Sequence, residues 1–295
     1  MSDNISISEI LKKIEQKLNA YGIEDAWLEA SLLVESCSGF DRLEQLRRPQ
    51  RQLTDQQITE LQAAVRERCR HKPLAQILGE ICFYGRPFYV NADVLTPRAD
   101  TEILVEAVIQ EVRERYTEAK AGIRVLDTCT GSGCIGLSIR LECGEEDFIR
   151  KLDLVDTSAA ALEVARRNSE RYALTGSHLS FYCCDLWPDA DTLYDVITCN
   201  PPYISRRDMA GLMPEVACYE PQRALYGGED GLDYYLRLAE EAADHLSSGG
   251  ILAVEHAYDQ REAIKKIFAA SPLNLLREAD DYGGNARVLI FEMTG

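Results

Sequence analysis

The alternation of strand-like and helix-like segments from Pro97 onward most constrains the fold of this 295-residue chain. Short runs rich in β-branched and apolar residues alternate with longer runs whose apolar residues recur every three or four positions. Such βα units fold with right-handed crossovers into a parallel sheet covered by helices on both faces. The expected strands are 124–127, 152–156, 179–185, 194–200, 251–255, 275–280 and 287–292, and the expected helices are 100–116, 134–141, 159–172, 232–246 and 260–270.

The last two expected strands lack an intervening helix. Only Tyr282-Gly283-Gly284-Asn285 separates them, so the sequence predicts an antiparallel hairpin at that point. The fold class is therefore α/β, a Rossmann-like, mostly parallel sheet of seven strands with an antiparallel element at one side.

The first 72 residues predict a small helical bundle instead. Apolar residues recur with helical spacing over 7–18, 25–38 and 54–70. Two β-rich runs then flank Gly85-Arg86, which indicates a short hairpin. We therefore expect three parts, an N-terminal helical domain at 1–75, a β-hairpin linker at 76–96 and the α/β domain at 97–295.

The charge of the chain limits its partners. The formal net charge is −17, of which residues 1–72 carry −1 and the remainder −16. A region that acidic repels phosphate backbones, which disfavours nucleic acid and favours a protein or small-molecule substrate.

Composition also predicts the compartment. No apolar run approaches the ~20 residues of a membrane span, and the polar, helix-like N-terminus does not resemble a signal peptide. The ten cysteines include no C-x-x-C pair, which favours reduced thiols over disulfides or zinc. We expect a cytoplasmic monomer without a metal or a membrane partner.

Four successive expected strands end in a polar residue. These residues are Asp127, Asp156, Asp185 and Asn200. Ligands of open α/β sheets bind outside the carboxyl ends of the strands, at the switch point of the strand order. One carboxylate at a strand end is ordinary helix capping, whereas four on one edge indicate a binding site.

A glycine-rich loop follows the first of these strands. Gly131, Gly133 and Gly136 satisfy G-x-G-x-x-G between a strand and a helix, although a tight turn alone also uses such glycines. The helix N-terminus offers N–H groups to a negative ligand group. Asp156 follows at about the distance, ~20 residues, expected of an acid that binds ribose hydroxyls. The pattern indicates an adenosine cofactor, with NAD as one candidate.

The tetrapeptide Asn200-Pro201-Pro202-Tyr203 ends the fourth expected strand. Two consecutive prolines offer no N–H to a sheet and fix φ near −65°, so the strand stops and a stiff loop follows. The asparagine and proline carbonyls can accept N–H bonds from a flat substrate with an NH2 group, and the tyrosine ring can cover its plane. Asparagine and proline are also common where a strand simply exits into a loop.

Residues 185–203 argue against NAD, because nothing in them marks an acid–base group or a nicotinamide slot. Asp185 can accept a hydrogen bond from an adenine amino group, with Leu186 and Trp187 beside the ring. The NH2-binding loop then lies against the reactive end of the cofactor. S-adenosylmethionine is the cofactor that this arrangement serves best.

At these residues the sequence resembles the Rossmann-like N-methyltransferases, whose fourth strand ends in (Asn/Asp)-Pro-Pro-(Tyr/Phe/Trp). More narrowly, it resembles the release factor glutamine methyltransferases (the PrmC/HemK family) over nearly its whole length. Thr128, Ala99 and Ala257 differ from common family residues, and none of these changes removes a polar group that the chemistry needs. The segments that match family blocks are 95–102, 127–133, 200–204, 219–225, 227–232 and 281–288.

The resemblance implies a class I methyltransferase whose N-terminal domain recognises the substrate. It implies methyl transfer from S-adenosylmethionine to the side-chain amide N5 of glutamine in the Gly-Gly-Gln motif of peptide-chain release factors, which modulates translation termination. The implied site places Cys129, Thr130, Gly131, Ser132 and Gly133 at the methionine part of the cofactor, Asp156 at the ribose, Asp185 and Leu186 at the adenine, Asn200 at both ligands, Pro201, Pro202 and Tyr203 at the glutamine, and Arg98, Glu220 and Arg223 along the substrate loop.

Two other functions stay open from the residues alone. A nucleic-acid adenine N6- or guanine N2-methyltransferase shares the tetrapeptide, although the acidic charge opposes it. A non-catalytic module that binds adenosine or a partner is the other alternative. Asp127 lies too far back in its strand to act as a base, and we expect it to hold the glycine loop.

Overall fold

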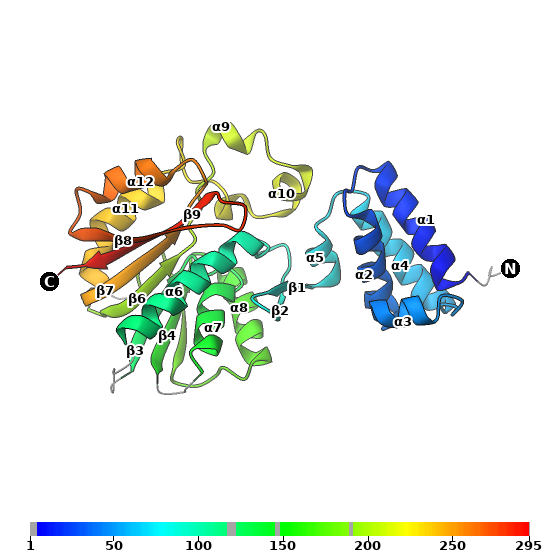
Figure 1. Cartoon of the computed structure of the whole chain (residues 1–295), viewed down its shortest axis with the longest axis horizontal. Helices are drawn as coiled ribbons and strands as arrows, with labels where there is room; N and C mark the ends of the chain where they lie inside the picture. Colours follow the sequence, from blue (N-terminus) through cyan, green and yellow to red (C-terminus); the bar gives the residue numbers. More distant parts are fainter. Residues whose placement is uncertain (1–4, 117–121, 145–147, 189–190, 295) are drawn as a thin grey trace. The chain divides into compact units, whose positions relative to one another are not determined.

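The computed structural model describes residues 5–116, 122–144, 148–188 and 191–294. They form two compact units. One contains the chain up to Gly79 together with Met213–Tyr219, and the other contains Glu80–Leu212 and Glu220–Gly295 (Figure 1). Among the described residues, no helix is long and apolar enough to cross a membrane.

The first unit is helical. Its predicted helices are confirmed, and capping boxes built on Ser6 and Thr54 begin two of them. The two shortest N-terminal helices were not predicted, because five or six residues are too few to show a helical period. The helices are α1 (Ile7–Ala20), α2 (Ala26–Ser38), α3 (Arg42–Arg47), α4 (Asp55–Arg68), α5 (Leu74–Leu78) and α10 (Pro214–Tyr219).

A buried arginine fixes α10 within this unit. Arg68 of α4 pairs with Glu29 of α2 at 2.5 Å and with Glu215 of α10 at 2.6 Å. Because the Arg68 side chain is almost completely buried, each carboxylate offsets part of the cost of burying its charge. A segment distant in sequence thus belongs to the N-terminal unit.

The second unit is the predicted α/β domain. Its seven-stranded sheet has the order β5-β4-β3-β6-β7-β9-β8, in which β9 is antiparallel to both neighbours. The closing hairpin is therefore confirmed. The strands are β3 (Ile123–Thr128), β4 (Ile149–Asp156), β5 (Leu179–Cys183), β6 (Tyr194–Cys199), β7 (Leu246–Glu255), β8 (Leu273–Asp280) and β9 (Ala286–Met293).

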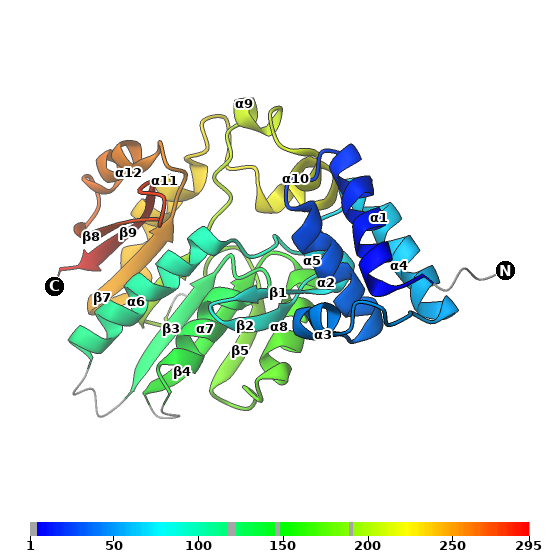
Figure 2. The same ribbon diagram turned by 45° about the vertical axis from the view of Figure 1, so that its right-hand side comes forward.

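Helices cover both faces of this sheet (Figures 1 and 2). Alternate residues of a strand point to opposite faces, so Ile251 and Ala253 of β7 pack on one side while Leu252 and Val254 pack on the other. The helices are α6 (Glu102–Arg115), α7 (Cys134–Glu142) and α8 (Ala159–Arg171) on the first side, α11 (Asp233–Glu241) and α12 (Arg261–Phe268) on the second, and α9 (Arg206–Met209) in a loop, with 3-10 turns η1 (Ala99–Thr101), η2 (Gln222–Ala224) and η3 (Ala242–His245).

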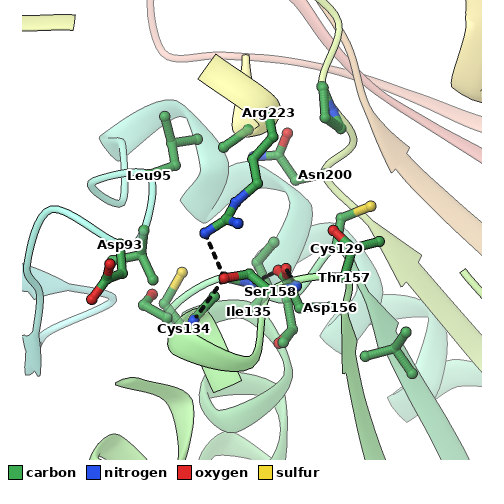
Figure 3. A pocket seen from close by; sticks show the side chains of 18 of the residues that line it. Asp93, Leu95, Cys129, Cys134, Ile135, Asp156, Thr157, Ser158, Asn200 and Arg223 are labelled. Carbon is green, nitrogen blue, oxygen red and sulfur yellow. Dashed lines mark hydrogen bonds between the residues drawn. The ribbon is translucent and has the colours of Figure 1, made fainter. Parts of the chain in front are cut away.

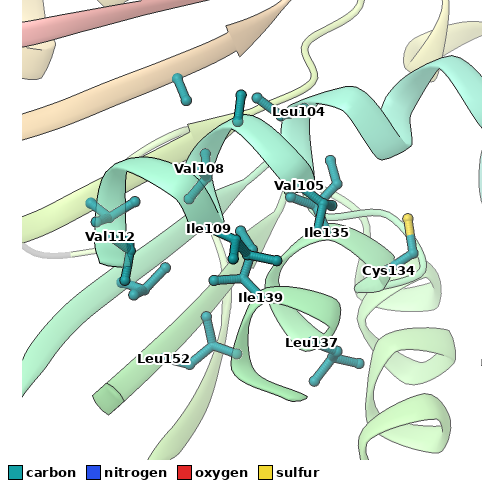
Figure 4. Packing of buried hydrophobic residues seen from close by; sticks show 14 of the residues in the cluster. Leu104, Val105, Val108, Ile109, Val112, Cys134, Ile135, Leu137, Ile139 and Leu152 are labelled. Atoms are coloured by element: carbon teal, nitrogen blue, oxygen red, sulfur yellow. The ribbon is translucent and has the colours of Figure 1, made fainter. Parts of the chain in front are cut away.

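The core beneath α6 and α7 shows why the two helices form where the sequence predicts. Leu104, Val108 and Val112 recur at four-residue spacing along α6, and all three are fully buried (Figure 4). Ile135 and Ile139 repeat the pattern in α7. This packing anchors α7, whose N-terminus carries the glycine-rich loop.

The β-hairpin is confirmed as β1 (Glu80–Phe83) and β2 (Arg86–Tyr89). Its turn residues are Tyr84 and Gly85, both with positive φ, as a type I′ turn requires. The buried Asn168 of α8 accepts from the Tyr89 N–H at 2.7 Å and donates to the carbonyls of Tyr89 and Ser132. The hairpin is thereby held against the glycine-rich loop of the α/β unit.

Two predicted boundaries are wrong. The strand expected to reach residue 185 ends at Cys183, because the chain turns sharply at Leu186, whose φ is 60°. The strand expected at 251–255 begins at Leu246, inside the span 232–246 expected to be helical. A bulge opposite β6, where the register shifts between Tyr194 and Val196, absorbs the extra residues around Gly249-Gly250.

Candidate active site

The glycine-rich loop connects β3 to α7 through backbone that favours glycine. Gly131 and Gly133 have φ of 54° and 79°, a region that other residues rarely adopt. A Cβ at Gly136 would lie 2.8 Å from Leu154 Cδ2 and 2.9 Å from Asp127 Cβ. The third glycine therefore lets α7 pack closely on β3 and β4.

Asp127 holds this loop, as predicted. Its Oδ2 accepts from the Thr130 hydroxyl at 2.5 Å and from the Gly136 N–H at 3.1 Å, and its Oδ1 accepts from the Thr198 hydroxyl at 2.8 Å. Complete burial raises the pKa of Asp127 to about 6, and the two threonine hydroxyls oppose that rise. Asp127 therefore acts within the scaffold and does not line the pocket.

Asp156, the last residue of β4, lies on the other side of the loop. Its Oδ2 accepts from the Gly131 N–H at 2.9 Å, and its Oδ1 accepts from the Ser158 N–H at 2.8 Å. Burial raises the pKa of Asp156, and these N–H bonds and Arg223 lower it. Each carboxylate oxygen keeps lone-pair capacity for a ligand hydroxyl.

A pocket opens above the carboxyl ends of β3, β4 and β6 (Figure 3). Arg223 of η2 reaches across it and donates to the Ser158 hydroxyl at 2.6 Å. The sequence-predicted residues that line it are Arg98, Cys129, Thr130, Gly131, Ser132, Asp156, Asp185, Leu186, Asn200, Pro202 and Arg223. Gly133, Pro201, Tyr203 and Glu220 lie outside this lining.

Asp185 differs from its predicted placement at a strand end. It lies in the loop after β5, and its exposed carboxylate pairs with Arg237 of α11 at 3.1 Å. Leu186 is buried with a positive φ, and its carbonyl accepts from the Thr128 hydroxyl at 3.0 Å. Thr128, where the family more commonly has an aliphatic residue, thus connects β3 to this turn.

Asn200 leaves β6 beside the glycine-rich loop. The parallel register pairs Thr128 with Cys199, so the following residues, Cys129 and Asn200, emerge from adjacent strands about 4.8 Å apart. The Asn200 Nδ2 donates to the Thr101 hydroxyl at 3.5 Å. The structure therefore brings the predicted amide group to the edge of the predicted cofactor loop.

The segment after β6 is braced by residues 225–227. The Ile204 N–H donates to the Leu225 carbonyl at 2.8 Å, and the Gly227 N–H donates to the Ile204 carbonyl at 2.9 Å. A Cβ at Gly227 would lie 2.5 Å from the Pro202 carbonyl oxygen, so only glycine allows this approach. The backbone of the tetrapeptide is therefore held by the loop that follows Glu220.

Comparisons with known proteins agree with this geometry. The PrmC N-terminal domain model matches residues 9–79, and the methyltransferase small domain model matches residues 100–217. The release factor glutamine methyltransferase of Agrobacterium fabrum is 34% identical over 286 residues, covering 97% of this chain and 97% of that protein. The Geobacter sulfurreducens protein of the same name is also 34% identical, covering 96% and 95%. This chain belongs to the release factor glutamine methyltransferase family.

The pocket of this methyltransferase suits the S-adenosylmethionine on which its family depends. The Ser132 hydroxyl lines the pocket, is buried and has no hydrogen-bond partner among the described residues, which leaves it available to a ligand. No atom lies within 4 Å of the position of a Cβ on Gly131. With the α7 N-terminus behind it, the loop has the space and the donors for a charged amino-acid moiety.

Tyr203 of the methyltransferase faces a buried carboxyl instead of the pocket. Its hydroxyl donates to Glu255 Oε1 at 3.3 Å, and its carbonyl accepts from Gln260 Nε2 at 3.0 Å. Burial, and secondarily the neighbouring Glu255, raises the pKa of Tyr203 far above its ordinary value. Tyr203 is therefore a neutral, fixed aromatic group next to Asn200.

Two residues of this site were missed from the sequence. Glu255 is the last residue of β7 and is 1% exposed, and Thr101 is 3% exposed. Burial raises the pKa of Glu255 to about 7, and the Thr101 hydroxyl is the main group that opposes the rise. Glu255 carried the same signal as Asp127 and Asp156, a carboxylate at a strand end, and that signal could have found it.

Arg98 and Glu220 form a pair. Arg98 Nη2 donates to both carboxylate oxygens of Glu220, at 2.7 and 2.8 Å. The Glu220 side chain is 1% exposed, whereas that of Arg98 is 44% exposed. The carboxylate is thus committed to Arg98, which leaves the arginine as the member of the pair that a ligand can reach.

Proposed function

We propose that this chain transfers a methyl group from S-adenosylmethionine to the side-chain amide nitrogen of the glutamine in the Gly-Gly-Gln motif of peptide-chain release factors. One observation carries the proposal. Asn200, an amide that can accept a hydrogen bond from a substrate NH2, emerges beside Cys129 of the glycine-rich loop and lines the same pocket. The names of relatives similar over nearly the whole chain support the choice of substrate.

The chemistry requires the nitrogen to be held, because an amide lone pair is delocalised into its carbonyl. The Asn200 Oδ1 and the Pro201 carbonyl would accept the two N–H bonds of the glutamine and direct its nitrogen toward the methyl donor. The buried prolines and the bracing by residues 225–227 keep these acceptors in place. Placement of this kind can contribute ~7–11 kcal/mol in favourable systems.

The bound cofactor would supply an electrophilic methyl group on a sulfonium. Cys129, Thr130, Gly131, Ser132 and Gly133 would hold its methionine part, Asp156 its ribose, and Asp185 with Leu186 its adenine. The acceptor dipoles at Asn200 and Pro201 also stabilise positive charge that develops on the substrate nitrogen. The methylated nitrogen is acidic enough to lose its proton to water, so the mechanism needs no strong base.

The N-terminal helical domain, which we assign to residues 1–75, would recognise the release factor, with residues 76–96 as the linker and 97–295 as the catalytic domain. We also propose that the enzyme acts as a monomer. A nucleic-acid methyltransferase would share the grip on an NH2 group. The net charge of −16 on residues 73–295 opposes that alternative, since a phosphate backbone would be repelled.

A peptide map tests the proposal. Purified release factor is incubated with the enzyme and S-adenosylmethionine, digested and analysed by mass spectrometry, with duplex DNA and tRNA as parallel substrates. We expect a gain of one methyl group on the peptide that contains Gly-Gly-Gln, located at the glutamine. Methylation of nucleic acid without modification of this peptide would refute the proposed substrate.

A further inference from the structure

Glu255 is a buried carboxyl group that the proposed chemistry does not use. Its Oε1 accepts from the Tyr203 hydroxyl at 3.3 Å, while its Oε2 is buried and has no partner with full hydrogen-bond geometry among the described residues. A buried carboxyl group with unused acceptor capacity is uncommon in a folded protein. Its position beside Tyr203 links it to the substrate side of the site.

Thr101 stands between this carboxyl group and Asn200. The Thr101 hydroxyl accepts from Asn200 Nδ2 at 3.5 Å, and the same hydroxyl lowers the pKa of Glu255 by hydrogen bonding to it. A hydroxyl has one proton to donate and two lone pairs to accept. If its proton faces Glu255, only its lone pairs face Asn200.

We propose that Glu255 is a positioning residue that determines, through the Thr101 hydroxyl, which end of the Asn200 amide faces the substrate. The inference rests on the proposed function, in which Asn200 Oδ1 accepts from the substrate NH2. An ionised Glu255 has no proton to donate, so Thr101 must donate to it and accept from Asn200 Nδ2. The Asn200 Oδ1 is then left on the substrate side.

Protonation of Glu255 reverses this order. A neutral carboxyl group donates to Thr101, whose own proton is then free to point toward Asn200 and to favour its oxygen. The Asn200 NH2 would then face the substrate NH2, and two donors cannot bond to each other. The active orientation of Asn200 therefore requires Glu255 to be ionised.

The groups around Glu255 set the pH at which this happens. Burial raises its pKa to about 7, Thr101, Arg287 and Tyr203 lower it, and Asp100 raises it. Arg287 of β9 does not ion-pair with Glu255, because its Nη2 pairs with Asp100 and with Asp281, each at 3.0 Å. The hydroxyl of Tyr235 on α11 donates to the Glu255 backbone carbonyl at 2.7 Å. Turnover should therefore rise with pH through about 7.

Side-chain NMR tests the relay without any substrate. The Asn200 Nδ2 resonance, assigned by its loss in Asn200→Asp, is followed from pH 5 to 9 in the full chain. In the wild type we expect a shift with a midpoint near 7. In Thr101→Val, which is nearly isosteric but lacks the hydroxyl, we expect the shift to shrink several-fold, and in Thr101→Ser we expect it to return. Glu255→Gln should abolish it.

A single-turnover assay on release factor adds the functional readout. We expect Thr101→Val to lose about 10-fold in methyl-transfer rate, with its cofactor KM unchanged and its acid limb near pH 7 flattened, while Thr101→Ser keeps both. A merely structural role for Thr101 would lower the rate but leave the acid limb in place.

The outcomes separate the two proposals. An Asn200 resonance insensitive to pH in the wild type, or equally sensitive in Thr101→Val, overturns the relay whatever the substrate is. A pH-sensitive resonance that depends on Thr101, combined with no methyl transfer to release factor, supports the relay and refutes only the proposed substrate.

Discussion

The two sides of the pocket are built differently. On the cofactor side, both oxygens of Asp127 and of Asp156 accept hydrogen bonds from the scaffold at 2.5–3.1 Å. On the substrate side, the Asn200 and Tyr203 side chains make contacts of 3.5 and 3.3 Å. The cofactor side is thus fully bonded before any ligand binds, while the substrate side keeps hydrogen-bond capacity.

This difference suggests a division of work. Short bonds to backbone N–H groups fix the shape of the cofactor loop, because the ligand touches that backbone. Longer side-chain contacts leave the substrate side able to tighten when a peptide arrives, as catalytic hydrogen bonds often do. Substitutions on the two sides should therefore affect different measurements.

The largest expected effect lies on the substrate side. Asn200→Ala removes the acceptor for the glutamine NH2, and we expect its single-turnover rate at saturating S-adenosylmethionine to fall ~100-fold or more. Rapid-quench detection of methylated release factor measures this rate. A variant that retains most of its turnover would exclude Asn200 as the group that holds the amide.

The next largest effect should appear on the cofactor side. Asp127→Ala leaves the Thr130 and Thr198 hydroxyls and the Gly136 N–H without their buried acceptor, a cost of about 1–3 kcal/mol for each unsatisfied group. We expect a lower melting temperature and a cofactor affinity reduced by about 10-fold or more. Calorimetry measures both, and normal affinity in a folded variant would contradict the role of Asp127.

A smaller effect is expected where the substrate loop is fixed. Arg98→Ala removes the partner of the buried Glu220 carboxylate, and we expect a loss of about 1–3 kcal/mol, reduced from that of a fully buried pair because Arg98 is partly exposed.

The effect of Arg98→Ala should depend on pH. Burial already raises the pKa of Glu220, and Arg98 is the main group that lowers it. Without Arg98 the folded pKa rises further, so the destabilisation should grow as the pH increases above the ordinary value of the carboxyl group. Urea unfolding at pH 5 and pH 8 measures this, with Arg98→Ala/Glu220→Gln as the control that removes the dependence.

The smallest effect is expected at the mouth of the pocket. Arg223→Ala removes a donor to Ser158 that crosses the pocket, but Ser158 still caps α8 by accepting from the Ala161 N–H. We expect the cofactor Kd to change by about 2- to 5-fold and the melting temperature to stay within 2 °C. Fluorescence titration measures the affinity, and a change of 100-fold would give Arg223 a central role in binding.

The sequence predicted the sheet because the period of its buried strands and covering helices is regular, and because Pro201-Pro202 must end a strand. It placed Asn200 beside the glycine-rich loop because neighbouring parallel strands end on one edge. It misplaced Asp185, since a positive φ at Leu186 leaves no mark in a run of apolar residues. The contact between Tyr203 and Glu255 joins segments 52 residues apart, and no local pattern encodes such a pair.

Cofactor affinity in Asn200→Ala tests the division of work most directly. Isothermal titration of S-adenosylmethionine into this variant and into the wild type compares one side of the pocket while the other is changed. We predict Kd values that agree within about 3-fold, although the variant is nearly inactive. A loss of affinity as large as the loss of turnover would show that Asn200 acts through the cofactor and would contradict the account.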